Sequence, residues 1–127
     1  MVYRVILDTS AAIELLNRKD KQILHTIEKE KPTEIFICGV TRFELGVGSE
    51  DDAQILDIPC LSMNCEMFGF AAKMYSLLKQ HGKMPGIKDC FIAACAITED
   101  SLLLTYNKDF EVFKEFGLNA KVLKKMQ

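Results

Sequence analysis

The sequence predicts an α/β fold, a three-layer α/β/α sandwich built around a central, mostly parallel sheet. Three observations support this prediction. Short apolar runs alternate with longer segments of helical periodicity along the 127 residues. The apolar runs repeatedly lead into helical segments, as in the crossover units that join parallel strands. No repeat, low-complexity tract or linker interrupts the alternation, so we expect one domain over residues 1–127.

The chain begins with a strand followed by two helices. Tyr3–Leu7 is rich in β-branched and apolar side chains, and it ends at the polar turn Asp8-Thr9-Ser10. A helical pattern starts directly after this turn. A second helix is expected from residue 20 or 21 to about residue 31, where Pro32 stops it.

A second strand-then-helix unit follows. Glu34–Cys38 is a short apolar run, and a helix is expected to begin at Thr41. Residues 46–57 contain two glycines and three consecutive acidic residues, so we expect an exposed, mobile loop there. Ile58–Leu61 is predicted to be a brief third strand.

The second half of the chain repeats the alternation. Asn64–Gln80 shows the spacing of an amphipathic helix, whose apolar stripe we interpret as core. Asp89–Thr98 is a second apolar helix, and Leu102–Leu104 is the strand that follows it. Asn107–Phe116 is predicted to be a short helix capped by a glycine, and Ala120–Leu123 to be the last strand.

The composition is that of an ordinary globular protein, with 49% hydrophobic and 27% charged residues. Sixteen basic and 18 acidic residues give a net charge of −2, so contact with nucleic acid must be local. The longest uncharged apolar run, Cys90–Ile97, is too short to cross a bilayer, and the N-terminus lacks a signal-peptide layout. We therefore expect a cytoplasmic protein without membrane contact, and five buried, reduced cysteines.

Acidic residues lie where a parallel sheet gathers its active groups, just beyond the carboxyl ends of the strands. Asp8 ends the first strand, and Glu44 lies in the first turns of the helix after the second strand. Asp89 opens a helix packed alongside, and Asp109 follows the strand at 102–104. Carboxylates brought together at one rim would repel each other unless a cation joined them. We therefore predict a site for Mg²⁺ or Mn²⁺, both of which prefer oxygen ligands.

The chemistry that such a site favours is phosphodiester cleavage by activated water. We expect Asp8 and Asp89 to hold the metal directly. Glu44 has a longer stem and is expected to act as the base or to position the water. Either Asp109 or Asn107 would complete the shell.

Four segments of the chain resemble, in order, the four motifs of PIN domains of the VapC toxin type. They are Val5-Ile6-Leu7-Asp8-Thr9-Ser10, Thr41-Arg42-Phe43-Glu44-Leu45, Lys88-Asp89-Cys90-Phe91-Ile92-Ala93-Ala94 and Leu104-Thr105-Tyr106-Asn107-Lys108-Asp109-Phe110. The resemblance spans nearly the whole chain. It implies a metal-dependent endonuclease for single-stranded RNA, often the toxin that pairs with a small antitoxin protein, and often a homodimer.

The same resemblance assigns residues to roles. Asp8, Glu44 and Asp89 match the three acids of the family, and Ser10 and Thr105 match its polar helper residues. Asn107 stands where many members carry an aspartate, and Asp109 is displaced from that place by two residues. The segment between the second motif and the long helix is also shorter than usual, which could trim an antitoxin or dimer surface.

Each candidate also has a simpler interpretation. Asp8 and Asp89 could cap helices, Glu44 could be a solvated helix residue, and Asp109 could be a first-turn acid. Basic residues near the predicted rim could neutralise RNA phosphates or could be ordinary surface charges. These residues are Arg42, Lys83, Lys88 and Lys108.

Other functions fit the sequence less well. A phosphatase of the haloacid dehalogenase type needs a second aspartate two positions after the first, where this chain has Ser10. A response-regulator receiver needs an acidic pair near the first strand, and Leu7 is the neighbour of Asp8. The remaining alternative is a catalytically weak PIN-like scaffold that binds RNA or a protein.

Overall fold

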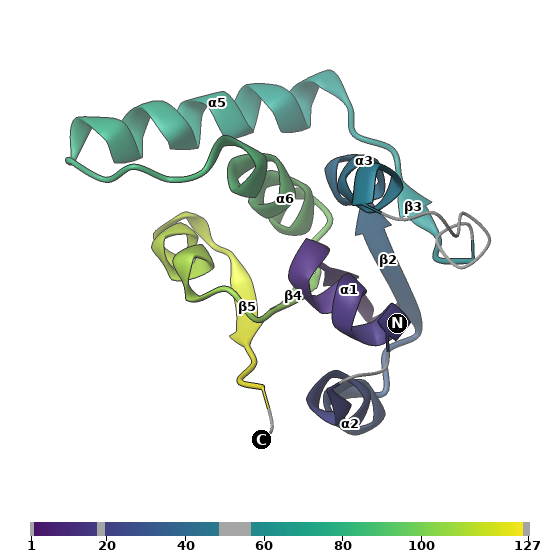
Figure 1. Cartoon of the computed structure of the whole chain (residues 1–127). Helices are drawn as coiled ribbons and strands as arrows, with labels where there is room; N and C mark the ends of the chain where they lie inside the picture. The colour runs from purple at the N-terminus through teal and green to yellow at the C-terminus, as the bar shows by residue number, and fades with distance from the viewer. Residues whose placement is uncertain (1, 18–19, 49–56, 126–127) are drawn as a thin grey trace.

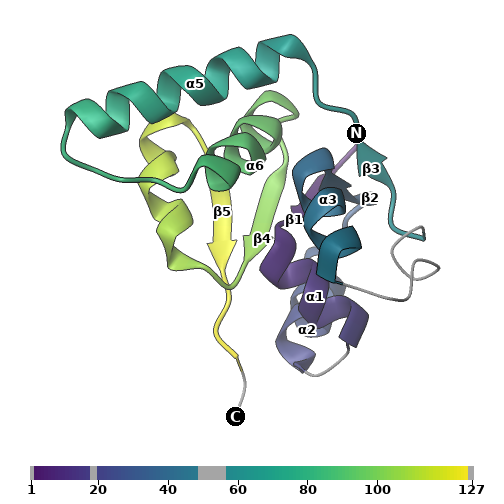
Figure 2. The same ribbon diagram turned by 45° about the horizontal axis from the view of Figure 1, so that its top comes forward.

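The computed structural model describes residues 2–17, 20–48 and 57–125. Its centre is a five-stranded sheet in which every neighbouring pair is parallel, in the order β3-β2-β1-β4-β5 (Figure 1; β1 is labelled in Figure 2). The predicted α/β fold with a parallel sheet is therefore confirmed. The strands are β1 (Arg4–Leu7), β2 (Glu34–Cys38), β3 (Cys60–Leu61), β4 (Leu102–Thr105) and β5 (Asn119–Val122).

Helices cover both faces of this sheet, which makes the three layers (Figure 2). Ile6, Cys38 and Leu103 point to one face and pack with α5, α6 and the 3₁₀ helix η1. Their sequence neighbours point to the other face and pack with α1, α2 and α3, as the two-residue period of a strand requires. The helices are α1 (Thr9–Asn17), α2 (Lys21–Glu30), α3 (Gly39–Gly48), α5 (Cys65–Gln80), α6 (Ile87–Thr98) and η1 (Lys108–Phe116). In the described part of the chain, no helix is both long and apolar enough to span a membrane.

The strand order places its switch point at β1. The chain passes from β1 to β2 on one side and later returns to pair β4 with β1 on the other. A crevice forms at such a switch because the crossover helices leave in opposite directions from the carboxyl ends of the strands. Asp8, the first residue after β1, thus lies where ligands bind in sheets of this kind.

Several helix boundaries differ from the sequence-based expectation. α3 starts at Gly39 and α6 at Ile87, each two residues earlier than predicted, and α3 extends to Gly48. The predicted loop at 46–57 is therefore partly helical, and its residues 49–56 lie outside the described residues.

The short helix near the C-terminus is a 3₁₀ helix and not an α-helix. Its buried side chains, Phe110 and Phe113, are three residues apart, and the half-buried Phe116 continues the series. A spacing of three matches the three residues per turn of a 3₁₀ helix. The spacing of these three phenylalanines therefore explains why this helix is wound more tightly than an α-helix.

The expectation of five buried cysteines is wrong for two of them. Cys38, Cys90 and Cys95 are buried, whereas Cys60 and Cys65 are exposed. Cys60 lies on the short edge strand β3, and Cys65 begins α5.

Candidate active site

Asp8 is held by three donors at the carboxyl end of β1. Its Oδ1 accepts hydrogen bonds from the backbone N–H of Ala11 at 2.9 Å and from the Ser10 hydroxyl at 2.7 Å. Its Oδ2 accepts one from the Thr105 hydroxyl at 2.6 Å. The residue as a whole is only 4% exposed. Burial raises the pKa of Asp8, and these hydrogen bonds oppose the rise because they favour the ionised form.

The donors around Asp8 are themselves fixed by the end of β4. The backbone N–H of Tyr106 donates to the Ser10 hydroxyl oxygen at 3.0 Å, and that of Asn107 donates to Thr105 Oγ1 at 2.9 Å. Each hydroxyl accepts one backbone hydrogen and can donate its own to the carboxylate. The predicted supporting residues Ser10 and Thr105 therefore connect Asp8, at the end of β1, to the backbone at the end of β4.

Glu44 reaches the same region from α3. Its Oε1 accepts a hydrogen bond from the Thr9 hydroxyl at 2.8 Å, and its Oε2 lies 3.7 Å from the Lys88 ammonium. About a quarter of the side chain, 26%, remains exposed. Glu44 is therefore tied to α1 and α6 and is not the freely solvated helix residue of the simpler interpretation.

Asp89 lies in the first turn of α6, where the negative charges of the other three acids act on its carboxylate. Its pKa is raised from the usual 3.8 to about 6, first by burial and then by the negative charges of Asp8, Asp109 and Glu44. The N-cap of α6 is Gly86, so Asp89 is not the capping residue, but it does lie in the first turn, at the positive end of the helix dipole. The capping interpretation holds for Asp8, which accepts the Ala11 N–H in the first turn of α1.

The start of η1 distinguishes Asn107 from Asp109. Asn107 is the N-cap, and its side-chain oxygen accepts the backbone N–H of Asp109 at 3.0 Å. Asp109 is a first-turn acid, as the simpler interpretation expected. Its negative charge also helps to raise the pKa of Asp89. The fourth carboxylate near the cluster is therefore Asp109, while Asn107 shapes the turn.

These four carboxylates, which we call the acidic cluster (Asp8, Glu44, Asp89 and Asp109), match the ligands that hard divalent cations prefer. As they stand, no three His, Cys, Asp or Glu side chains within the described ranges are arranged to hold a metal ion. Mutual repulsion between carboxylates favours such spread positions in the absence of a cation. The donor set therefore fits Mg²⁺ or Mn²⁺ in chemistry, and binding would have to draw the side chains closer.

The predicted RNA-contacting residues take different positions. Lys88, Lys83 and Lys108 are exposed, and Lys88 pairs with Glu44 at the edge of the acidic cluster. Arg42 is half-buried on α3 near Cys60.

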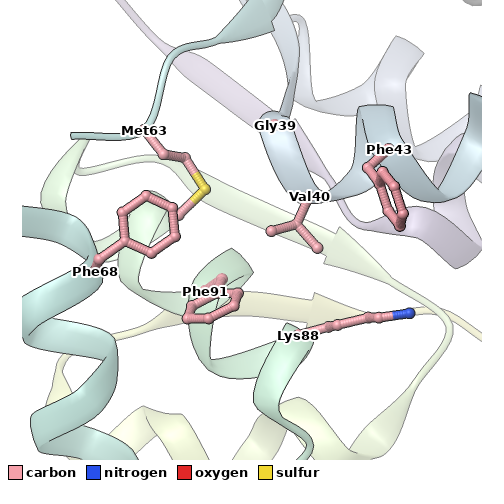
Figure 3. Close-up of a pocket in the computed structure, with 7 residues that line it drawn as sticks. All are labelled: Gly39, Val40, Phe43, Met63, Phe68, Lys88 and Phe91. Carbon is pink, nitrogen blue, oxygen red and sulfur yellow. The ribbon is translucent and has the colours of Figure 1, made fainter. Parts of the chain in front are cut away.

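A hollow of about 370 Å³ lies beside the acidic cluster, between α3, α5 and α6 (Figure 3). Its walls are apolar except for Lys88, which also faces Glu44. None of the side chains that line the hollow is a carboxylate, imidazole or thiol, so the hollow itself offers no group for acid–base or nucleophilic chemistry. It is lined by Gly39, Val40, Phe43, Met63, Phe68, Lys88 and Phe91.

Two threonines at the site were not singled out from the sequence. Thr9 donates to Glu44, and its hydroxyl oxygen lies 3.4 Å from that of Thr41. Thr41 precedes Glu44 by three residues, a spacing that puts both on one helix face. That spacing, and the position of Thr9 directly after Asp8, are the signals that point to them.

The PIN-domain family profile matches residues 5–115. Because this match covers most of the 127 residues, the chain belongs to the PIN-domain family. A search of curated proteins returned no match.

Several solved structures with the same fold are VapBC structures, one of them described as a member of the VapBC family of toxin–antitoxin systems. DNA-bound VapBC from Salmonella typhimurium matches with a TM-score of 0.79 and 20% identity, over 96% of this chain and 98% of that chain. VapBC-1 from nontypeable Haemophilus influenzae matches with a TM-score of 0.76 and 23% identity, over 94% and 97%. VapBC-5 from Mycobacterium tuberculosis, of the VapBC family of toxin–antitoxin systems, matches with a TM-score of 0.65 and 24% identity, over 95% and 98%.

Proposed function

We propose that this chain is a metal-dependent endoribonuclease of the VapC type. The observation that carries the proposal is the acidic cluster at the switch point of the sheet. The four carboxylates come from four separate segments, and the negative charges of Asp8, Asp109 and Glu44 raise the pKa of Asp89. Among the described residues, the only ammonium paired with them is that of Lys88. A site with this excess of negative charge and oxygen donors suits a divalent cation.

Each member of the acidic cluster has a distinct task in this proposal. Asp8, Asp89 and Asp109 would hold Mg²⁺ or Mn²⁺, which when bound neutralises phosphate charge and lowers the pKa of water. Glu44 orients the attacking water and accepts its proton. A new P–O bond forms to this water, the bond from phosphorus to the leaving oxygen of the RNA breaks, and that oxygen takes a proton from solvent. Ser10 and Thr105 keep Asp8 in place through their hydrogen bonds.

Family membership and the neighbouring structures support a proposal for the substrate class and the partners. We propose single-stranded RNA as the substrate, with Lys88 next to the acidic cluster and Arg42, Lys83 and Lys108 as further phosphate contacts. Because several structural neighbours are VapBC complexes, we also propose a small antitoxin protein as a partner. A homodimer acting in the cytoplasm completes the proposal.

A cleavage assay tests this function. Purified protein should cut an unstructured RNA in Mn²⁺ or Mg²⁺, and EDTA should stop the reaction. Asp8→Asn should lower the rate by about a hundredfold or more without unfolding the protein, because it removes one charge from a ligand. Asp100→Asn is the matched control, since Asp100 is exposed in the turn before β4, at the opposite end of that strand, and should keep full activity.

The same assay separates the enzyme from the scaffold alternative. A catalytically weak scaffold would bind the RNA and leave it whole in every metal. Equal cleavage by wild type and Asp8→Asn would instead point to a contaminating nuclease and would contradict the proposal.

A further inference from the structure

We propose that Thr9 is a positioning residue for Glu44, an inference that rests on the proposed nuclease function. Thr9 is the first residue of α1 and follows Asp8 directly. Its hydroxyl donates a hydrogen bond to Glu44 Oε1 at 2.8 Å. This bond joins the helix that starts beside one acid to the helix that carries another.

The hydrogen of Thr9 has one best acceptor. A threonine hydroxyl carries a single hydrogen, and an ionised carboxylate can only accept. The Thr9 oxygen is 2.8 Å from Glu44 Oε1 and 3.4 Å from the Thr41 oxygen, so the shorter, charge-assisted bond takes the hydrogen. The buried Thr41 hydroxyl remains within 3.4 Å of the Thr9 oxygen and 3.8 Å of the Cys38 sulfur.

Thr9 is also the stronger of the two contacts that orient Glu44. The other contact, Lys88, is 3.7 Å away, and 61% of its side chain is exposed. Exposed ion pairs of that length contribute little because solvent screens them. A glutamate has three rotatable side-chain bonds, so without the Thr9 hydroxyl its carboxylate would sample several orientations. A base or water-positioning group must instead hold one orientation.

The test compares two substitutions that separate the hydroxyl from the shape of the side chain. Thr9→Val keeps the shape and loses the hydroxyl, whereas Thr9→Ser keeps the hydroxyl and loses a methyl group. We expect Thr9→Val to lower kcat for Mn²⁺-dependent RNA cleavage by about tenfold or more, with KM unchanged. Thr9→Ser should stay within about twofold of wild type.

Two further measurements distinguish positioning from a structural role. Both variants should remain folded with a cooperative melting transition. Both should also keep the wild-type affinity for Mn²⁺ measured by calorimetry, because the Asp8 contacts do not involve the Thr9 hydroxyl. The matched control is Thr26→Val, which removes a buried threonine hydroxyl that bonds within α2 and should leave kcat unchanged.

The outcomes are separable. An active wild type with an equally active Thr9→Val overturns this inference and leaves the proposed function standing. Loss of activity in Thr9→Ser but not in Thr9→Val overturns it as well, since packing would then be the cause. Weaker Mn²⁺ binding by Thr9→Val would show that Thr9 acts through Asp8 and not through Glu44. A wild type that leaves RNA whole overturns the proposed function and this inference together.

Discussion

Asp8 and Asp89 are both aspartates at the start of a helix, yet their surroundings differ. Asp8 is buried among hydroxyl and amide donors that stabilise its charge. Asp89 faces carboxylates, and the negative charges around it add to the effect of burial. Capping therefore accounts for part of what Asp8 does, whereas Asp89 is not the N-cap of its helix, which makes Asp89 the better probe of the acidic cluster.

The raised pKa of Asp89 predicts how stability depends on pH in the metal-free protein. Its pKa is about 6 in the folded chain and near the usual 3.8 in the unfolded one. The contribution to stability is therefore complete below the unfolded value and is lost as pH rises through the folded value. At neutral pH in EDTA, Asp89→Asn should raise the free energy of unfolding by about 1 kcal/mol, a discounted figure because Asp89 is partly exposed.

Urea denaturation of wild type and Asp89→Asn, at several pH values in EDTA, measures this difference. The gain should be largest at neutral pH and should shrink towards pH 4, and excess Mn²⁺ should reverse its sign. A variant that is less stable than wild type at neutral pH in EDTA would contradict this picture of Asp89.

At the scale of single elements, the start of α6 places Asp89. Gly86 is the N-cap, and a Cβ added there would lie 3.2 Å from Asp89 Oδ2. Such a contact would displace the carboxylate by a few tenths of an ångström. A misplacement of about 1 Å at a reacting group can cost roughly a hundredfold in rate, so Gly86→Ala should slow RNA cleavage by about three- to tenfold.

The matched control is Gly69→Ala on α5. A Cβ at Gly69 meets nothing within 4 Å, and the position lies inside a helix. This variant should keep full activity and gain about 0.5 to 1 kcal/mol in the free energy of unfolding, because alanine favours helix more than glycine does. Equal activity of both glycine variants would mean that the position of Asp89 does not limit the rate.

Element geometry also explains what the sequence could not specify. The strand ends that carry Asp8 and Thr105 were predictable, because apolar runs followed by polar turns mark them. The first residue of each helix was not, since α3 and α6 begin two residues before the position that the sequence pattern indicates. The choice between Asn107 and Asp109 depended on where η1 begins and on its 3₁₀ winding, which follows from the packing of Phe110 and Phe113.

At the scale of the whole molecule, strand order decides which distant residues meet. The alternation of strands and helices predicted a parallel sheet, and the four motifs predicted which carboxylates would gather. The strands that pair with β1 are set by the folded topology and not by the local sequence pattern. These strands, β2 and β4, lie on either side of β1 and therefore of Asp8 at its end. Contacts between side chains of different segments, such as Thr9 with Glu44, likewise required the assembled fold.

The most direct test of the central claim is a crystal structure of the protein soaked in Mn²⁺, with data collected to reveal anomalous scattering from manganese. We predict one strong anomalous peak within bonding distance of Asp8 and Asp89, with Asp109 drawn towards it and the Thr9 bond to Glu44 intact. A peak elsewhere on the surface, or none at the acidic cluster in crystals that hold millimolar Mn²⁺, would contradict the account.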